Sequence, residues 1–325
     1  MFRILFSAGL RVLTQAGFVA VVVGVLSFFL TRSLPGDAAF RIAAGRYGYD
    51  NVNAASAAAV RAELGLDLPA WQQLLTWVGD LASFRLGQSM VSGESVFEHL
   101  APTLGATLHL SLAAWVLAVV LGVVLGTIAE VRRGWIAHVI DKVCTVLRGS
   151  PPFLIGLLLM LGLAVHLKWL PVAGYGDTEN VVLPALTLAL ALCGGIAQVV
   201  RSRLEQVLAS DAFEFAQIKG LPLGAALWRH AAPAVALPTL AYSGVQLILL
   251  IEGVVVVETL FAWPGVGHAL VHSVVERDVP VIQGAALLMG LLFVVLNTLV
   301  DTAVKLLDPR QREGNGAVAS EGEFA

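Results

Sequence analysis

Few residues of this chain have types and spacing that suit chemistry. His268 and His272 are four residues apart, a spacing that puts two side chains on one helical face and can serve a metal. Structural or solvated histidines are the favoured interpretation, because the sequence has no CxxC pair and no His/Cys cluster. Cys144 and Cys193 lie in apolar stretches, which favours packing. No GxxxxGK(S/T), HExxH or GxSxG motif occurs, so the sequence predicts no catalytic residue, no metal site and no phosphate-binding loop.

Charged residues inside apolar stretches are stronger candidates, because a charge in lipid is costly and usually has a function. Arg148 lies beside Pro151 and Pro152, which remove backbone donors and should kink the segment. The freed carbonyls must face protein or water, so Arg148 either lines a path or anchors the segment near the cytoplasmic surface. Other charges near the ends of apolar stretches are candidates for interface pairs: Glu252, Glu258 and Asp301. We take Arg148, Pro151 and Glu258 as candidate pathway or gate residues.

The elements that position these residues follow from composition. Hydrophobic residues make up 58% of the chain, charged residues 13%, and the mean hydropathy is +0.83, whereas soluble domains carry about 25% charged residues. A helix needs about 20 apolar residues to cross a bilayer, and the stretches that meet or approach this length are Leu13–Thr31, Gly105–Ala129, Ile140–Val165, Val181–Arg201, Val235–Ile251 and Val281–Ala303. Since lipid-exposed backbone must bond internally and the alternation of a membrane barrel is absent, we predict an all-α, polytopic bundle of six transmembrane helices. The net charge of −3 gives no indication of a nucleic-acid partner.

The positions of Lys and Arg orient the predicted bundle. With the N-terminus inside, the two short outside loops hold only Lys168 and Arg277, and the inside segments hold Arg3, Arg11, Arg132, Arg133, Lys142, Arg201, Arg203, Lys219, Arg229, Lys305, Arg310 and Arg312. Both termini are therefore predicted to be cytoplasmic. We interpret the first apolar run as an uncleaved span and not a secretory signal, because further spans follow and its flank lacks a small-residue cleavage site.

These assignments divide the chain into four parts. Residues 1–31 form the cytoplasmic N-terminus and the first helix, and residues 32–104 form a long external loop with a short helix around Ala57–Leu64 and an amphipathic stretch at Trp71–Leu81. Residues 105–307 form helices two to six with a cytoplasmic loop at 202–233, and residues 308–325 form a disordered cytoplasmic tail. Gly122 and Gly126 in the second span have a spacing that allows close approach of a neighbouring helix.

The cytoplasmic loop contains a predicted amphipathic helix over Asp211–Pro222, followed by a second short helix through Leu227–His230. Phe213, Ala216 and Gly220 share one face of this helix. Asp211 and Glu214, near its start, suit the positive end of the helix dipole. Gly220 and Pro222 should end it. The segment is either an ordinary surface helix between two spans or a helix that docks into a groove of a cytoplasmic partner.

The pattern Glu214–x–Ala216–x–x–x–Gly220, followed by Arg229–His230–Ala231 and Leu237–Pro238, resembles the EAA loop of binding-protein-dependent ABC importer permeases. Further stretches narrow the resemblance to the B-type subunit of the dipeptide/oligopeptide/nickel permease family: Arg32–Asp37, Glu63–Pro69, Asp80–Leu81, Leu86–Ser89, Pro102–Leu104, Trp169–Pro171, Leu183–Leu188, Val257–Gly267 and Leu307–Arg310. The resemblance covers about residues 3–312. The sequence departs from the family at Ala212 and Gln217, where Tyr and Arg are usual, and at Arg148–Pro151, which replaces a more apolar stretch.

The resemblance implies a permease subunit of the bacterial inner membrane that is not itself an enzyme and binds no cofactor. It implies a homologous permease as partner, two cytoplasmic ATPase subunits that bind ATP and Mg²⁺, and an external solute-binding protein. The coupling helix to the ATPases would comprise Asp211, Phe213, Glu214, Ala216, Lys219 and Gly220. The solute would be a di- or oligopeptide, with nickel or a metal chelate as the alternative.

Two other classes of membrane protein compete with this interpretation. An ion-coupled secondary transporter would need membrane-buried charges and often inverted repeats, and the spans carry few charges and no evident repeat. A channel or structural scaffold would not need the EAA-like loop. Only the importer requires a tightly bound ATPase, so co-purification separates the three classes.

Overall fold

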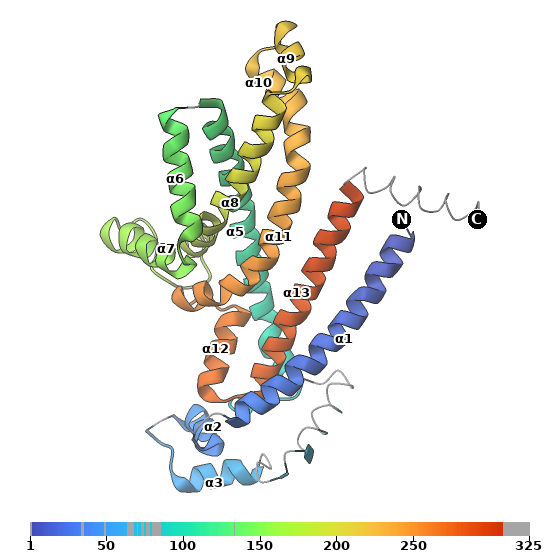
Figure 1. Ribbon diagram of the computed structural model, residues 1–325. Helices are drawn as coiled ribbons and strands as arrows, with labels where there is room; N and C mark the ends of the chain where they lie inside the picture. Colours follow the sequence, from blue (N-terminus) through green and yellow to red (C-terminus); the bar gives the residue numbers. More distant parts are fainter. Residues whose placement is uncertain are drawn as a thin grey trace, which may run out of the picture. The chain divides into compact units, whose positions relative to one another are not determined.

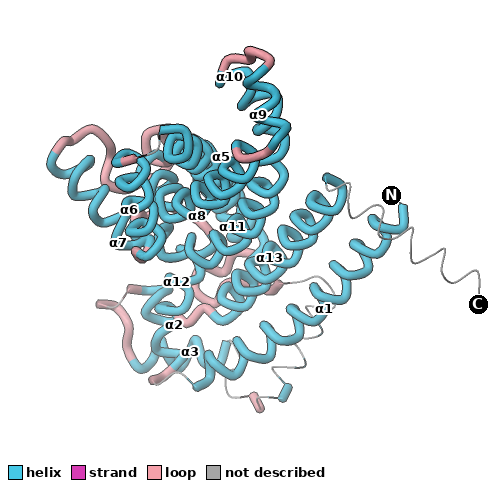
Figure 2. The backbone as a smooth tube through the Cα atoms, turned by 45° about the horizontal axis from the view of Figure 1, so that its top comes forward, coloured by secondary structure: helices cyan, strands magenta, loops and turns pink. Residues whose placement is uncertain are grey.

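The computed structural model describes residues 2–33, 36–48, 50–63, 68–69, 71–72, 75, 79, 86–132 and 134–307. These residues form helices and loops, with one isolated bridge between Gln88 and Ser95 (Figure 1; Figure 2). The helices are α1 (Phe2–Ser33), α2 (Ala38–Tyr47), α3 (Ala54–Glu63), α5 (Val96–Arg132), α6 (Trp135–Gly149), α7 (Pro152–Leu159), α8 (Val182–Leu208), α9 (Asp211–Ile218), α10 (Leu223–Ala226), α11 (Ala232–Leu260), α12 (Val266–Glu276) and α13 (Val279–Leu307). Two π-helical turns, Met160–His166 and Leu227–Ala231, follow α7 and α10.

Four helices within the described residues are long and apolar enough to cross a membrane: Val96–Arg132, Val182–Leu208, Leu223–Ile251 and Val279–Lys305. The pair Trp135–Gly149 and Pro152–His166 passes the same test together, which makes five if the pair is one span, and a shorter apolar helix covers Val12–Leu26. The all-helical membrane class is therefore confirmed. The total of six spans stays a prediction.

The third apolar stretch is not one straight helix. Its two halves are bent by 111° at the break after Gly149. Pro151 has extended backbone angles, and Pro152 begins α7, where its missing N–H costs no helical hydrogen bond. The predicted kink at these prolines is confirmed, and the expected continuous span over Ile140–Val165 is replaced by two helices at a sharp angle.

The helices divide into two compact units, and the first comprises residues 1–10, 110–261 and 295–325. Within it α8 packs against α6, α7 and α11. Glycines of α5 allow it to approach α8 closely as well. A Cβ on Gly126 would lie 2.5 Å from the backbone oxygen of Ala197, and one on Gly122 would lie 2.6 Å from Ile196 Cβ. The close approach predicted from the spacing of these two glycines is therefore confirmed.

Glycines of α8 allow close packing in the same way. A Cβ on Gly194 would lie 2.6 Å from the carbonyl oxygen of Cys144 in α6, and one on Gly195 would lie 2.5 Å from the hydroxyl of Tyr242 in α11. Membrane helices associate by close van der Waals contact, which small residues permit. Helix α8 thus packs closely against α5, α6 and α11 and holds these three helices together.

The second unit comprises residues 11–109 and 262–294. In it α2 and α3 pack through buried Ile42, Ala43 and Val60, which confirms the predicted short helix near Ala57–Leu64. Asp37 caps α2 by accepting a hydrogen bond from the Ala39 N–H, and Arg61 of α3 donates to the same carboxylate at 2.6 Å. The Arg61 hydrogen bond holds the pKa of Asp37 below its ordinary value, although burial acts in the opposite direction.

The segment before α12 is tied to α5 within the second unit. The Trp263 indole N–H donates to the carbonyl of Ala106 at 3.0 Å, and the Val266 N–H donates to the Thr107 hydroxyl at 2.9 Å. Trp263 and Thr107 are both buried. These hydrogen bonds satisfy polar groups that would otherwise be costly to bury.

Several expected boundaries differ from those of the structure. Helix α5 begins at Val96, inside the segment 32–104 expected as loop, and α8 continues to Leu208, beyond the expected end at Arg201. The predicted second short helix at Leu227–His230 is a π-helical turn that leads directly into α11. Apolar runs mark only the lipid-compatible part of a helix, so they end before the hydrogen-bonded helix does. The tail 308–325 and most of Trp71–Leu81 lie outside the described residues.

Candidate functional site

The predicted cytoplasmic helix exists as α9, at the end of the first unit where α8 and α11 are joined (Figure 1). Ser210 precedes it with extended backbone angles, and its carbonyl accepts from the N–H groups of Phe213 and Glu214. The helix ends where Gly220 adopts a φ of +81° and the Leu221 N–H donates to the Ala216 carbonyl at 3.2 Å. This is the glycine-dependent helix ending predicted from the sequence. We call residues 209–231 the α9 hairpin.

The two faces of α9 have different roles in the hairpin. Phe213 and Ala216 are buried, so they attach the helix to its own chain. Phe215 and Ile218 are 57% and 75% exposed. The ammonium of Lys219 lies 4.4 Å from the centre of the Phe215 ring, a cation–π contact. The exposed apolar side chains are therefore on the face opposite to the one that the sequence pattern singled out.

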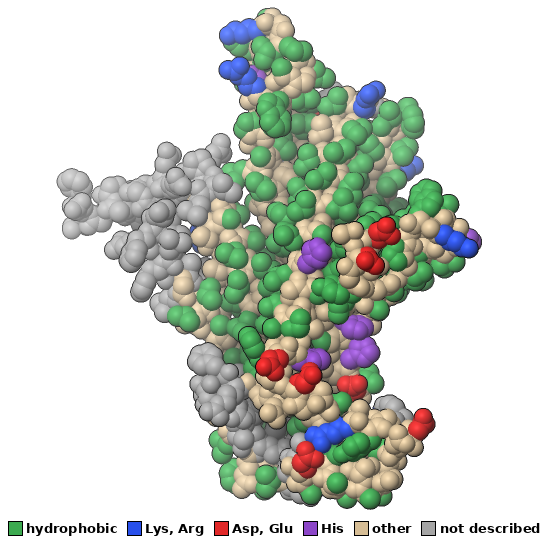
Figure 3. All heavy atoms as spheres, turned by 180° about the vertical axis from the view of Figure 1, so that it is seen from behind, with side chains coloured by type: hydrophobic (Ala, Val, Ile, Leu, Met, Phe, Trp, Pro, Cys, Tyr) green, Lys and Arg blue, Asp and Glu red, His purple; other side chains and the backbone are tan. Residues whose placement is uncertain are grey.

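The remaining predicted coupling residues are exposed. Asp211, Glu214 and Gly220 all lie on the surface of the hairpin. Two more apolar side chains, Leu223 and Trp228, are exposed on the following turns, with Trp228 at 81%. Figure 3 shows basic side chains at the α9–α10 end of the first unit, beside apolar ones. An exposed surface of aromatic, aliphatic and basic side chains is the kind that protein interfaces use.

Phe215 and Ile218 are not among the coupling residues predicted from the sequence. Their spacing of three residues was a usable signal, since i and i+3 positions are neighbours on a helix. What the pattern could not decide is which of two apolar pairs, Phe213 with Ala216 or Phe215 with Ile218, the chain covers itself.

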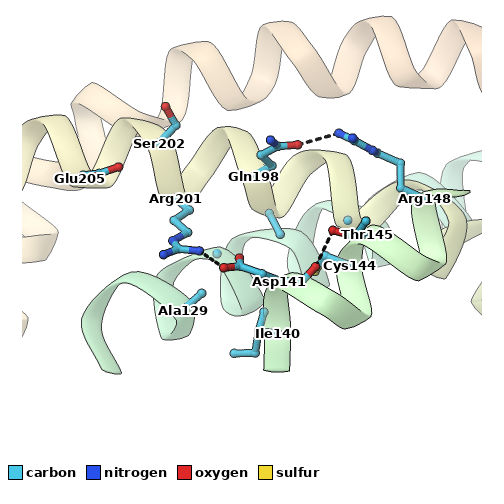
Figure 4. Close-up of a pocket in the computed structure, with 13 residues that line it drawn as sticks. Ala129, Ile140, Asp141, Cys144, Thr145, Arg148, Gln198, Arg201, Ser202 and Glu205 are labelled. Carbon is cyan, nitrogen blue, oxygen red and sulfur yellow. Dashed lines mark hydrogen bonds and ion pairs between the residues drawn. The ribbon is translucent and has the colours of Figure 1, made fainter. Parts of the chain in front are cut away.

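A cavity with polar walls lies between α6 and α8, and residues of α5 also line it. This cavity of about 380 Å³ is lined by residues that include Asp141, Thr145, Arg148, Gln198, Arg201 and Glu205. On each helix these residues recur at spacings of three and four, so each helix presents a polar stripe to the cavity. Figure 4 shows Arg201 of α8 pointing toward Asp141 of α6, and Arg148 of α6 reaching toward Gln198 of α8. We call this cavity the α6–α8 groove.

Arg201 joins three helices at the groove. Its guanidinium donates to Asp141 of α6 and lies 3.4 Å from Oε2 of Glu130 in α5 (Figure 4). Glu130 is 4% exposed, and a buried carboxylate is costly unless it is paired. Arg201 was predicted from the sequence only as one of the charges that orient the bundle, and this cluster of charges was not predicted. Its signal was the presence of charges near the facing ends of three apolar stretches.

We expect Arg201→Ala to destabilise the first unit, because it leaves Glu130 and Asp141 without this cation. Of the three side chains only Glu130 is buried, so we expect the loss of these charged hydrogen bonds to cost about 1–3 kcal/mol. Thermal unfolding in detergent, followed by the loss of the monodisperse protein, measures the change. Arg203→Gln is the matched control, since Arg203 is on the same helix and hydrogen-bonds only the neutral Gln206 among the described residues. Equal melting temperatures for the two variants would show that the cluster contributes nothing.

The candidate pathway residues are found in separate places of the first unit. Arg148 is exposed at the end of α6, where it donates to Oε1 of Gln198 at 2.6 Å. Pro151 is at the break between α6 and α7. Glu258 is fully buried near the end of α11. The structure thus brings Arg148 into the groove and does not bring Glu258 there.

The histidines singled out for their spacing lie on α12 in the second unit, with ring centres 4.5 Å apart. Burial, and then the neighbouring His272, lower the pKa of His268, so His268 favours its neutral form. Among the described residues, no group of three or more His, Cys, Asp and Glu side chains is placed to hold a metal ion.

Residues 118–313, which include the groove and the α9 hairpin, match the family described as "Binding-protein-dependent transport system inner membrane component". A putative peptide transport system permease protein of Brucella abortus is 35% identical over 312 residues, covering 93% of this chain and 98% of that protein. The glutathione transport system permease protein GsiC of Escherichia coli is 34% identical (90% and 94% covered), and the di/tripeptide transport system permease protein DppB of Pseudomonas aeruginosa is 33% identical (89% and 94% covered).

A helical membrane protein with a hairpin presented beyond its apolar helices fits the class of transport permeases. The chain belongs to the family of inner-membrane components of binding-protein-dependent transport systems, the permeases of ABC importers. It is a multi-pass protein of the inner membrane.

Proposed function

We propose that this chain forms half of the translocation path of an ATP-driven importer of short peptides. The observation that carries the proposal is its similarity, over nearly its whole length, to proteins named as permeases for peptides, di/tripeptides and glutathione. A homologous permease supplies the other half of the path. Two cytoplasmic ATPase subunits bind ATP and Mg²⁺, and an external binding protein delivers the solute.

The proposed topology has six spans with both termini in the cytoplasm. The distribution of Lys and Arg supports it. In this topology the α9 hairpin projects into the cytoplasm, and residues 32–104 lie outside. The bent α6–α7 pair serves as the third span, and α1 as the first.

The α9 hairpin couples the permease to an ATPase. Its proposed coupling residues are Asp211, Phe213, Glu214, Ala216, Lys219 and Gly220, to which we add the exposed Phe215 and Ile218. The hairpin is held between α8 and α11, which pack against one another. Closure of the ATPases on ATP would therefore move the hairpin and these two helices together, and so favour the outward-open arrangement by differential binding.

The path itself is proposed to use Arg148, Pro151 and Glu258. A guanidinium within a membrane-spanning helix pair must face protein or water, which supports Arg148 as a path residue. The break at Pro151 leaves backbone groups with the same requirement. Glu258 is buried in the interior of the first unit, where a change of its environment would favour one arrangement over the other.

The proposal is tested by purifying the chain from its native membrane in mild detergents. We expect an ATPase subunit to co-purify with the wild type and to be lost from the double variant Glu214→Arg plus Gly220→Arg. The first change puts a cation at the positive end of α9, and the second puts a side chain on a left-handed residue. Absence of any ATPase from the wild type would overturn the importer mechanism. ATP-driven uptake of nickel with no uptake of peptides would overturn the proposed solute.

A further inference from the structure

The charge of the α6–α8 groove differs between its middle and its two ends. In its middle, Arg201 is neutralised by Asp141 and Glu130. At one end, Arg148 donates a single hydrogen bond, to the neutral amide of Gln198, so most of its N–H donors have no partner among the described residues. At the other end, Glu205 is exposed and makes no ion pair with any described residue. The groove therefore offers a free cation and a free anion at opposite ends.

Helix α8 indicates how far apart the two ends of the groove lie, because it carries Glu205 at one end and the partner of Arg148 at the other. Gln198, which holds Arg148, and Glu205 are seven residues apart on α8, so they share a face and are separated by about 10 Å along the axis. An extended chain advances about 3.5 Å for each residue, so three residues span about 10 Å. This axial offset of Gln198 and Glu205 is close to the distance between the ammonium and the carboxylate of an extended tripeptide.

The walls between the two ends suit a peptide main chain. Ser202 is among the residues that line the same cavity, and Gln198 retains its amide N–H₂ for a hydrogen bond. A cavity of about 380 Å³ is within the range of small-molecule sites. The carboxylate of Glu205, unpaired among the described residues, disfavours a ligand that is anionic at both ends, because it would repel the second negative charge.

We propose that the α6–α8 groove is a cytoplasmic-side binding site for a zwitterionic tripeptide, whose carboxylate binds Arg148 and whose ammonium binds Glu205. This rests on the proposed function, since it assigns a place on this chain to the peptide that the importer carries. The peptide's carboxylate lies toward the α6–α7 break, and its ammonium lies toward the end of α8 that leads to the α9 hairpin. Arg201 and Asp141 are positioning residues, which hold the two helices at the width of the peptide.

Direct binding to the complete transport complex in lipid nanodiscs, without the binding protein, tests the site. The probes are trialanine, its N-acetyl and amide derivatives, and free alanine. We expect each cap to weaken binding to the wild type about tenfold, the effect of one charge-assisted hydrogen bond pair. Free alanine is too short to reach both charges and should bind weakly.

The variants assign each terminus to a residue. Arg148→Gln should weaken trialanine about tenfold and leave trialanine amide unaffected, whereas Glu205→Gln should weaken trialanine and leave N-acetyl-trialanine unaffected. Arg148→Lys should restore the preference for a free carboxylate, which a merely structural role would not do. Arg203→Gln removes a charge from the same helix outside the groove and should bind like the wild type.

Uptake of trialanine into proteoliposomes that also contain the binding protein separates the two proposals. Normal uptake together with unchanged binding in Arg148→Gln and Glu205→Gln would overturn the site and leave the peptide importer intact. Absence of trialanine binding to the wild type would also overturn the site. Absence of uptake of any peptide by an assembled, ATP-hydrolysing complex would overturn the proposed function itself.

Discussion

Replacing Phe215 and Ile218 by aspartate is expected to detach the ATPase from the permease and to abolish ATP-driven uptake. Both side chains are more than half exposed on α9, yet both are large and apolar. Burying each against a partner contributes roughly 1.5–3 kcal/mol, so the double change should weaken the association at least about a hundredfold. Co-purification and ATP-dependent uptake measure the two consequences.

Two further variants make this result specific. Val275→Asp introduces the same change at an exposed apolar position of α12, and it should leave the ATPase bound. Phe213→Ala removes a buried side chain of the same helix, so it should lower the melting temperature of the permease itself. Retention of the ATPase by the Phe215→Asp, Ile218→Asp double variant would show that the hairpin binds through another surface.

Replacing Gly126 or Gly194 by leucine is expected to prevent the first unit from folding. A Cβ at Gly126 would lie 2.5 Å from the carbonyl oxygen of Ala197, and one at Gly194 would lie 2.6 Å from that of Cys144. Both carbonyl oxygens are backbone atoms, so no side-chain rotation can relieve the clash. Even alanine should cost about 3 kcal/mol at either position, because two helices must separate to admit it. Fluorescence-detected gel filtration after heating would measure the surviving monodisperse fraction.

Gly105 supplies the matched control on α5. A Cβ added there meets no atom within 4 Å, so Gly105→Ala should leave the melting temperature unchanged or raise it slightly, since alanine is the better helix former. A normal melting temperature for Gly126→Ala would mean that α5 and α8 are not held at the separation seen in the structure.

The sequence by itself determined the features that depend on local composition. Long apolar runs predicted membrane helices because backbone polar groups must be satisfied within the segment in lipid. Pro151 and Pro152 predicted the break between α6 and α7, and Gly220 predicted the end of α9, because both effects belong to the residue's own backbone. The EAA-like pattern indicated the family, which the comparisons confirmed.

Only the tertiary structure decided which faces of these helices are covered and which charges meet. Periodicity shows that Phe213 and Ala216 share a face, but the burial of that face depends on how the hairpin folds back on its own chain. Arg201 meets Glu130 and Asp141, and Arg148 meets Gln198, across sequence separations of 50 to 71 residues. Such pairs depend on the rotation and separation of packed helices, which the local sequence preference for helix does not determine. The α6–α8 groove is therefore a product of helix packing, whereas the helices that form it follow from the chain alone.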